Sequence, residues 1–165
     1  MQTIATLFLH SAIKRLLYYK DLGDKTLGRL GDDDFHFQPN EESNSIAIII
    51  QHVSGNMLSR WTDFLTSDGE KEWRQRDAVF EQQNLFKNDL IAMWEKGWQC
   101  CIDTLQLLTP DDLLKTITIR QEPLSVIDAI NRQLAHYPYH VGQIIYIAKI
   151  LHNHQWESLS IPRKK

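Results

Sequence analysis

The sequence predicts an all-α protein, and more specifically a four-helix bundle. Apolar residues recur at spacings of three and four along four long segments, whereas the alternation typical of strands is almost absent. The 165 residues are 42% apolar and 24% charged, with only 7 Gly and 5 Pro, which is the composition of an ordinary globular domain. We therefore expect residues 1–165 to form a single domain in which amphipathic helices of roughly 20 to 30 residues enclose one core.

The first predicted helix covers residues 3 to about 30, because its leucines and isoleucines fall on one helical face. Glycines weaken its end, and the acidic run at residues 32–34 begins a loop. A second helix is predicted from residue 46 to about 66. Either Asn44 or Ser45 can cap its first turn, since both side chains accept hydrogen bonds from backbone N–H groups.

Residues 70–78 form a mixed-charge connection that is too polar for the core and long enough to carry the chain along a bundle. A third helix is expected from about residue 80 to 108, where Pro110 prevents its continuation. The segment Thr-Ile-Thr-Ile at residues 116–119 alternates β-branched residues, and this pattern predicts a small extended piece.

The fourth predicted helix runs from about residue 124 to 153 and carries apolar residues at helical spacing throughout. Its start lies at Ser125 or at the pair Glu122-Pro123. Pro138 falls inside this helix, removes one backbone donor, and either bends the helix or marks an irregular point in it.

Charge and composition exclude several classes of function. A net charge of −3 and a pI near 6.1 argue against a nucleic-acid partner, because no excess basic charge is available for phosphates. No apolar run approaches the roughly 20 residues that cross a bilayer, and no basic residue precedes the first apolar stretch, so we expect neither a membrane span nor a signal peptide. Cys100 and Cys101 are adjacent and poorly placed for a disulfide, which favours a reduced, cytoplasmic setting.

The strongest chemical signal is a set of three histidines. His136 and His140 stand four apart in the fourth predicted helix, so both imidazoles lie on one face. Gln143 and Arg132 continue this polar stripe, and His52 lies in an apolar stretch of the second predicted helix that could face it. Three neutral imidazoles with one position left for water would suit Zn²⁺ or Ni²⁺.

Two other interpretations of these histidines remain at this point. A histidine pair at this spacing also arises by chance, and buried imidazoles are often satisfied by neighbouring backbone or side-chain groups. The sequence His-Tyr-Pro-Tyr-His at residues 136–140 has no glutamate after the first histidine, so it does not indicate a zinc protease.

Three stretches together resemble the DinB-like superfamily. They are Asn44-Ser45-Ile46-Ala47, then Gln51-His52-Val53 followed by Asn56 and Arg60, and the run from Gln133 to Ile144, which contains His-x-x-x-His-x-x-Gln. The resemblance implies a bundle of up-down-down-up topology with a divalent metal between its helices. By motif position, the ligands it implies are His52, His136 and His140. Members of this superfamily include thiol S-transferases that use small thiols such as bacillithiol, mycothiol-dependent isomerases and hydrolases, and homodimers are common among them.

We therefore expect a cytoplasmic, homodimeric, metal-dependent enzyme acting on a small molecule. In this hypothesis His52, His136 and His140 bind Zn²⁺ or Ni²⁺, while Gln143 orients a ligand or water. The reaction would be transfer of a low-molecular-weight thiol to an electrophile, or hydrolysis by metal-activated water. The alternative from another class is a non-catalytic dimeric metal-binding or stress-response bundle. No general base is evident, since Asp128 lies eight positions before His136.

Overall fold

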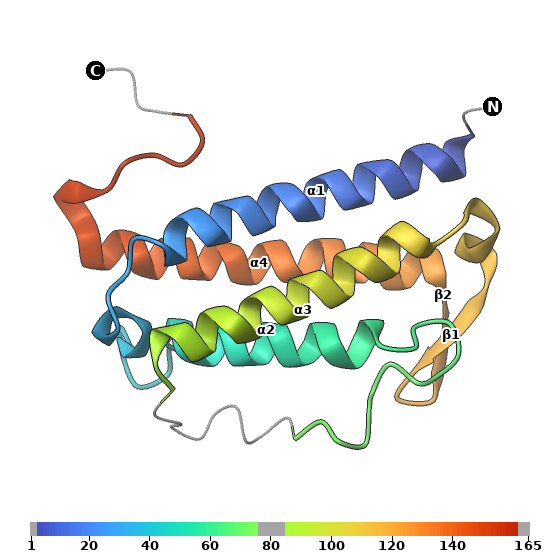
Figure 1. Ribbon diagram of the computed structural model, residues 1–165, viewed down its shortest axis with the longest axis horizontal. Helices are drawn as coiled ribbons and strands as arrows, with labels where there is room; N and C mark the ends of the chain where they lie inside the picture. Colours follow the sequence, from blue (N-terminus) through green and yellow to red (C-terminus); the bar gives the residue numbers. More distant parts are fainter. Residues whose placement is uncertain (1–2, 76–84, 162–165) are drawn as a thin grey trace.

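Four helices form most of the computed structural model, which describes residues 3–75 and 85–161 (Figure 1). The helices are α1 (Ile4–Leu27), α2 (Ile46–Trp61), α3 (Lys87–Leu107) and α4 (Val126–His152). Two strands, β1 (Thr116–Ile119) and β2 (Glu122–Ser125), form one antiparallel hairpin. Three short 3-10 helices complete the described elements: η1 (Asp33–His36), η3 (Pro110–Leu114) and η4 (Asn153–Gln155). The all-α class is thus confirmed in its broad form.

The helices lie side by side with their apolar faces inward. In Figure 1, α1 and α4 run in one direction, and α2 and α3 run in the opposite direction. α2 packs most extensively on α3, and α1 on α4. Gly97 allows the close approach of α3 to α2, because a Cβ there would lie 2.9 Å from the backbone Cα of Ser54. Within the described ranges, no helix combines the length and apolar character that a membrane span requires.

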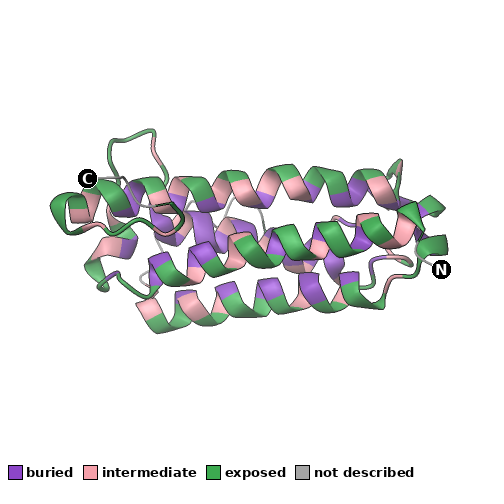
Figure 2. Cartoon of the chain, turned by 90° about the horizontal axis from the view of Figure 1, so that it is seen from above, coloured by how far each residue is buried: buried purple, intermediate pink, exposed green. Residues whose placement is uncertain are grey.

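Large apolar side chains fill the centre of the bundle. Buried positions follow the inward faces of the helices, whereas exposed positions face outward (Figure 2). The largest fully buried side chains include five aromatic ones, namely Trp61, Trp94, Trp98, Tyr137 and Phe35. Burial of aromatic side chains of this size supplies a large share of the hydrophobic stabilisation.

The structure confirms one of the two predicted caps of α2 and corrects the predicted end of this helix. Of the two candidates for α2, Ser45 is the cap, and its hydroxyl accepts the N–H of Ile48 at 3.3 Å. α2 ends at Trp61 rather than near residue 66. The reason is that the backbone leaves the helical region at Thr62, whose ψ is 126°, and then turns at Asp63, whose φ is 50°. α3 is described from Lys87, and the predicted start near residue 80 lies outside the described residues.

The hairpin corrects the predicted start of the fourth helix. The extended piece at residues 116–119 is confirmed as β1, but Glu122-Pro123 belongs to β2 and does not begin a helix. Ser125 caps α4 instead, accepting the N–H of Asp128 at 3.2 Å. α4 then continues through Pro138 to His152 as one helix.

Candidate metal centre

Three imidazoles from two helices converge near the middle of the bundle. α2 supplies His52, and α4 supplies His136 and His140 from successive turns. One ring nitrogen of each residue lies within 4.8 Å of the other two. The Nε2 atom of His136 is 3.0 Å from Nε2 of His140 and 3.4 Å from Nε2 of His52. All three side chains are half-buried, and no other group of three or more His, Cys, Asp or Glu residues converges in this way within the described ranges.

Two glutamines fix the outward-facing nitrogens of the α4 pair. Nδ1 of His136 lies 3.2 Å from Oε1 of Gln133, and Nδ1 of His140 lies 2.8 Å from Oε1 of Gln143. The amide of Gln143 is itself oriented, because its Nε2 donates to the Tyr139 hydroxyl at 3.0 Å. Since an amide oxygen can only accept, each Nδ1 carries the proton and donates. The Nε2 atoms of His136 and His140 therefore present lone pairs to one another.

This arrangement fits a divalent cation. Two lone pairs 3.0 Å apart with no hydrogen between them repel, and a cation placed between them would turn that repulsion into coordination. In a tetrahedral zinc site the ligand nitrogens are about 3.3 Å apart, given Zn–N bonds of about 2.0–2.1 Å. The observed separations of 3.0 and 3.4 Å are close to this value. Imidazole is also a donor that Zn²⁺ and Ni²⁺ accept readily.

The electrostatics keep the two imidazoles of α4 neutral. Burial lowers the pKa of His136 to about 3, and nearby positive charge contributes to the same shift. Arg132 and Arg60 carry such a charge, and His140 and His52 would add to it if they were protonated. Burial also lowers the pKa of His140, even though its hydrogen bond to Gln143 acts in the opposite direction. Neutral imidazole is the form that binds metal.

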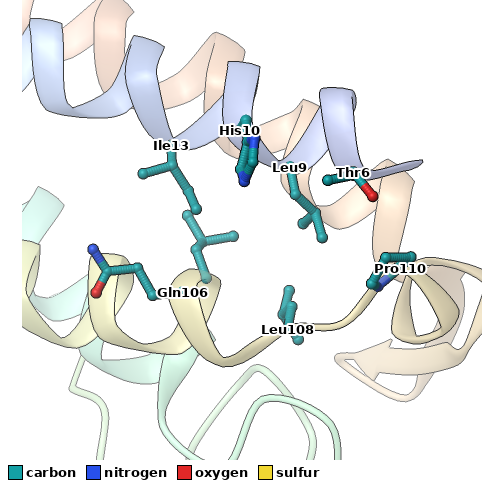
Figure 3. Close-up of a pocket in the computed structure, with 8 residues that line it drawn as sticks. Thr6, Leu9, His10, Ile13, Gln106, Leu108 and Pro110 are labelled. Carbon is teal, nitrogen blue, oxygen red and sulfur yellow. The ribbon is translucent and has the colours of Figure 1, made fainter. Parts of the chain in front are cut away.

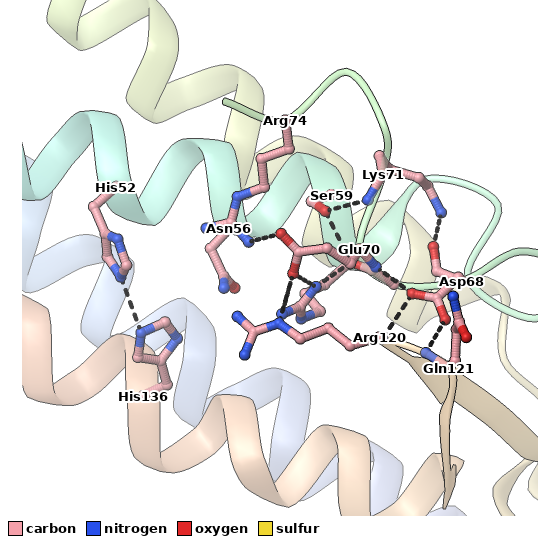
Figure 4. A network of polar contacts seen from close by, with 12 residues as sticks. His52, Asn56, Ser59, Asp68, Glu70, Lys71, Arg74, Arg120, Gln121 and His136 are labelled. Atoms are coloured by element: carbon pink, nitrogen blue, oxygen red, sulfur yellow. Dashed lines mark hydrogen bonds and ion pairs between the residues drawn. The ribbon is translucent and has the colours of Figure 1, made fainter. Parts of the chain in front are cut away.

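A small polar cavity of about 190 Å³ adjoins the histidines. His52 and His136 form one part of its wall, and four arginines contribute to the rest, with no carboxylate among the described lining residues. The remaining lining side chains are Asn56, Arg60, Arg74, Arg120, Arg132 and Gln133. In Figure 4 the Arg120 guanidinium points toward the His52–His136 pair. The metal candidate therefore borders an open, positively charged space.

One carboxylate, Glu70, holds three of these arginines in place (Figure 4). Its Oε2 atom lies 3.1 Å from Nη2 of Arg60 and 3.2 Å from Nε of Arg120, and its Oε1 atom lies 3.6 Å from Nη1 of Arg74. Burial alone would raise the pKa of Glu70, but the hydrogen bond from Arg60 and the charge of Arg74 lower it below its usual value. Glu70 is thus ionised and committed to the arginines, so it is not a general base for the histidine cluster.

A series of buried side-chain hydrogen bonds supports one wall of the cavity. Nε1 of Trp61 donates to the Tyr137 hydroxyl at 2.9 Å, and that hydroxyl donates to Oδ1 of Asn56 at 3.1 Å. Because Asn56 lines the cavity, this chain connects the cavity wall to the aromatic core.

Larger cavities lie elsewhere. One, of about 550 Å³, is bordered by Gln143 and Tyr139 and therefore approaches the histidine cluster through the residue that orients His140. Another, of about 430 Å³, lies between α1 and the end of α3, and His10 is among the described residues that line it (Figure 3). His10 itself is exposed.

Most of the residues that the sequence analysis selected lie at or beside the histidine cluster, and one does not. His52, His136 and His140 come together, Gln143 contacts the cluster, and Arg132 lines the adjoining cavity. Asp128 is exposed in the first turn of α4 and lies outside the cluster.

The cysteines lie apart from the histidines, and both are free thiols. Cys101 is fully buried, and burial raises the pKa of its thiol. A thiol held protonated in this way is a poor nucleophile.

Sequence reasoning missed the role of Gln133 and the network around Glu70. A signal for Gln133 existed, because it lies three positions before His136 just as Gln143 lies three positions after His140. No comparable signal linked Glu70 to Arg120, since these two residues lie 50 positions apart in the sequence.

The comparisons with known proteins agree with this fold. The model of a family described as "Protein of unknown function (DUF1572)" matches residues 3–165, and the chain belongs to this family. The chain is similar to the crystal structure of a DinB-like protein, YjoA, from Bacillus subtilis, with a TM-score of 0.67 and 12% identity over 94% of this chain and 99% of that one. This similarity shows that the chain has the DinB-like fold. No curated protein matches it in sequence.

Proposed function

We propose that this member of the DUF1572 family, with its DinB-like fold, is a metal-dependent enzyme that transfers a small thiol to an electrophilic small molecule. One observation carries the proposal: three half-buried imidazole nitrogens lie within 4.8 Å of one another, and two of the rings are turned toward the common centre by glutamine oxygens. In this proposal His52, His136 and His140 are the metal ligands, and the ion is Zn²⁺ or Ni²⁺.

The chain's own residues have distinct roles. Gln133 and Gln143 keep the proton of His136 and His140 on Nδ1, which leaves Nε2 free to coordinate. A bound divalent ion would lower the pKa of a thiol or water beside it, so that the nucleophile forms near neutral pH. In the transfer, the thiol proton goes to solvent, sulfur forms the bond to the electrophilic carbon, and the leaving group departs with its electron pair.

Two features favour thiol transfer over hydrolysis. Cavities of about 190 and 550 Å³ approach the cluster through different residues, which suits a reaction with two organic substrates. The described residues that line the smaller cavity include no carboxylate, and a thiol requires less help from a general base than water does because it is the stronger acid. Hydrolysis by metal-activated water is the second candidate reaction.

The adjoining cavity also favours an enzyme over a non-catalytic bundle. A structural metal site is closed by a fourth protein ligand, whereas a catalytic one keeps a position open. Among the described residues, the converging set stops at three imidazoles and borders a cavity, as a catalytic site would.

The proposal includes the organisation that the superfamily resemblance implies. The chain would act as one domain of up-down-down-up topology, which the helix directions in Figure 1 support. It would form a homodimer, and exposed apolar side chains such as Leu7 and Leu17 on α1 and Tyr146 and Ile150 on α4 offer a surface for one. The two free thiols suit a reducing, cytoplasmic setting.

Metal content is the first test. We would purify the chain without a histidine tag, incubate it with Zn²⁺ or Ni²⁺, and measure bound metal by elemental analysis for wild type, His136→Ala and His10→Ala. We expect about one equivalent in wild type and in His10→Ala, whose imidazole is exposed on α1, and none in His136→Ala. Full occupancy in His136→Ala would refute the ligand assignment.

Activity is the second test. Metal-loaded wild type would be incubated with a panel of small thiols and an electrophile, and the thioether product followed by mass spectrometry. Product that depends on both the metal and His136 supports the transferase. Metal-dependent hydrolysis of ester or amide substrates without any thiol reaction would favour the second candidate, and a metal-loaded protein inactive in both assays would favour the non-catalytic bundle.

A further inference from the structure

We propose that the cavity beside the histidines binds the oxyanion group of the substrate, a carboxylate or a phosphate, and therefore that the substrate is a small anion. This inference specifies the substrate of the proposed enzyme, and the role of the anion site in catalysis rests on that proposed function. The binding itself depends on arginines that are not metal ligands, and it can be measured separately.

The charge around the cavity is strongly unbalanced. Four guanidinium groups line it, namely those of Arg60, Arg74, Arg120 and Arg132. Glu70 pairs with the first three of these, and Arg132 makes no ion pair with a described residue. One carboxylate therefore faces four positive charges. Imidazole side chains supply no negative charge, so they would leave the charge of a bound cation uncompensated, and an anion is the favoured occupant.

The guanidinium groups are held before any ligand arrives. The Arg60 side chain is 5% exposed, and it donates to the carbonyl oxygen of Gly69 as well as to Glu70. Its Nε is buried and has no hydrogen-bond partner. Unsatisfied buried donors of this kind are costly, and an oxyanion is the partner that offsets the cost best.

Arg120 lies in a strained turn, which determines where its side chain points. Arg120 and Gln121 both have positive φ, at 57° and 66°, in a two-residue hairpin where Gly or Asn is usual. The carboxylate of Asp68 accepts both of their backbone N–H groups, at 2.9 and 2.7 Å. The turn aims the Arg120 guanidinium toward the histidine pair (Figure 4). Strain of this kind concentrates at ligand sites.

The size of the cavity limits what it can hold. At about 190 Å³ it is smaller than the roughly 300–1,000 Å³ of typical small-molecule sites, so it suits one anionic head group. Because His52 and His136 share its wall, a head group bound by the arginines would place the rest of the substrate next to the candidate metal. Guanidinium groups match carboxylate and phosphate with paired hydrogen bonds, so the arginines would orient the substrate as well as attract it.

The test measures anion affinity without relying on turnover. Inorganic phosphate and malonate would be titrated, by calorimetry, into the protein as purified and after chelator treatment, at low ionic strength. The variants are Arg132→Gln, which alters an exposed residue of α4 and should keep the fold, and Arg15→Gln as the matched control on exposed α1 surface. We expect Arg132→Gln to weaken anion binding about tenfold to a hundredfold, and Arg15→Gln to leave it unchanged.

Each outcome decides one proposal. Equal anion affinity in Arg132→Gln and wild type, or no saturable binding of either anion to wild type, would overturn the anion site whatever the metal content. Elemental analysis of the same samples reports on the proposed function, since Arg132→Gln should retain full metal. Saturable, Arg132-dependent binding in a wild type that takes up no metal would retain the anion site and refute the metalloenzyme. Tighter binding of phosphate than of malonate assigns a phosphate head group, and the reverse assigns a carboxylate.

Discussion

At the scale of single residues, two glutamine side chains control the protonation of the candidate metal ligands. Gln133 and Gln143 are placed symmetrically around the α4 histidines, one three positions before His136 and the other three positions after His140. Each accepts the Nδ1 proton of its histidine, at 3.2 and 2.8 Å. Without these acceptors the proton could move to Nε2, where it would block coordination.

Replacing Gln133 should therefore weaken metal binding while leaving the three histidines intact. We expect Gln133→Leu to lower the affinity for Zn²⁺ about tenfold to a hundredfold, the usual effect of losing a partner of a ligating histidine. Competition with a chromophoric chelator measures this affinity. Gln51→Leu is a suitable control, because Gln51 is as buried as Gln133 but its amide donates to a carbonyl of its own helix. Equal affinities for the two variants would show that Gln133 does not position His136.

Residues of the candidate site could be predicted from the sequence where neighbouring positions alone identify them. His136, His140 and Gln143 are visible because helical spacing alone places them on one face. His52 lies 84 residues before His136, and only its apolar surroundings and the DinB-like resemblance brought it into the set. Arg120 was not predicted at all, since its position depends on a turn conformation that its residue type does not favour.

At the scale of elements, the hairpin β1–β2 depends on a side chain outside it. Asp68 accepts the backbone N–H groups of Glu70, Arg120 and Gln121 at 2.7, 2.9 and 2.7 Å. These bonds compensate for the positive φ angles of the turn. Gly69 lets the two segments meet, because a Cβ there would lie 3.0 Å from Cγ1 of Ile119. The carboxylate thus connects the loop after α2 to the turn that carries Arg120, which lines the cavity.

This connection predicts a pH dependence of stability. Burial would raise the pKa of Asp68, but the hydrogen bonds from the backbone N–H groups of Glu70, Gln121 and Arg120 lower it well below its usual range. A depressed pKa in the folded state means that the contribution is fully present above the unfolded pKa of about 3.9 and is lost as the pH falls below it. We expect Asp68→Asn to lower the melting temperature at pH 7 by about 2–6 °C and to have a smaller effect near pH 2.5.

Melting curves followed by circular dichroism across this pH range would test the prediction. Asp128→Asn is a useful control, because Asp128 is an exposed carboxylate in the first turn of α4, whereas Asp68 is half-buried in the loop after α2. A destabilisation by Asp68→Asn that is the same at both pH values would show that the carboxylate charge does not hold the turn.

Element boundaries were predictable where a local rule decides them. The hydroxyl caps at Ser45 and Ser125 follow from residue type, and the Thr-Ile-Thr-Ile alternation marked β1. The end of α2 near Trp61 and the strand at Glu122–Ser125 were not predicted, because both depend on positive φ values at residues other than glycine. Such conformations are imposed by tertiary contacts.

At the scale of the whole molecule, the candidate metal centre joins the two halves of the bundle. α2 packs mainly on α3, and α4 mainly on α1, so a ligand set drawn from α2 and α4 bridges the two helix pairs. The all-α class follows from periodicity alone, but this bridging does not, since helical spacing does not determine which helices face each other.

Bridging predicts that metal stabilises the entire fold. A ligand that binds only the native state adds about 2.7 kcal/mol at a free concentration 100 times its dissociation constant, which corresponds to about 5–10 °C in the melting temperature of a domain of this size. We expect this increase with Zn²⁺ or Ni²⁺ and its reversal by a chelator. Mg²⁺, which prefers oxygen ligands, should have no effect, and neither should Zn²⁺ on His136→Ala. An equal shift in wild type and His136→Ala would mean that the ion acts elsewhere on the chain, because one imidazole of three should be enough to disconnect α4 from α2.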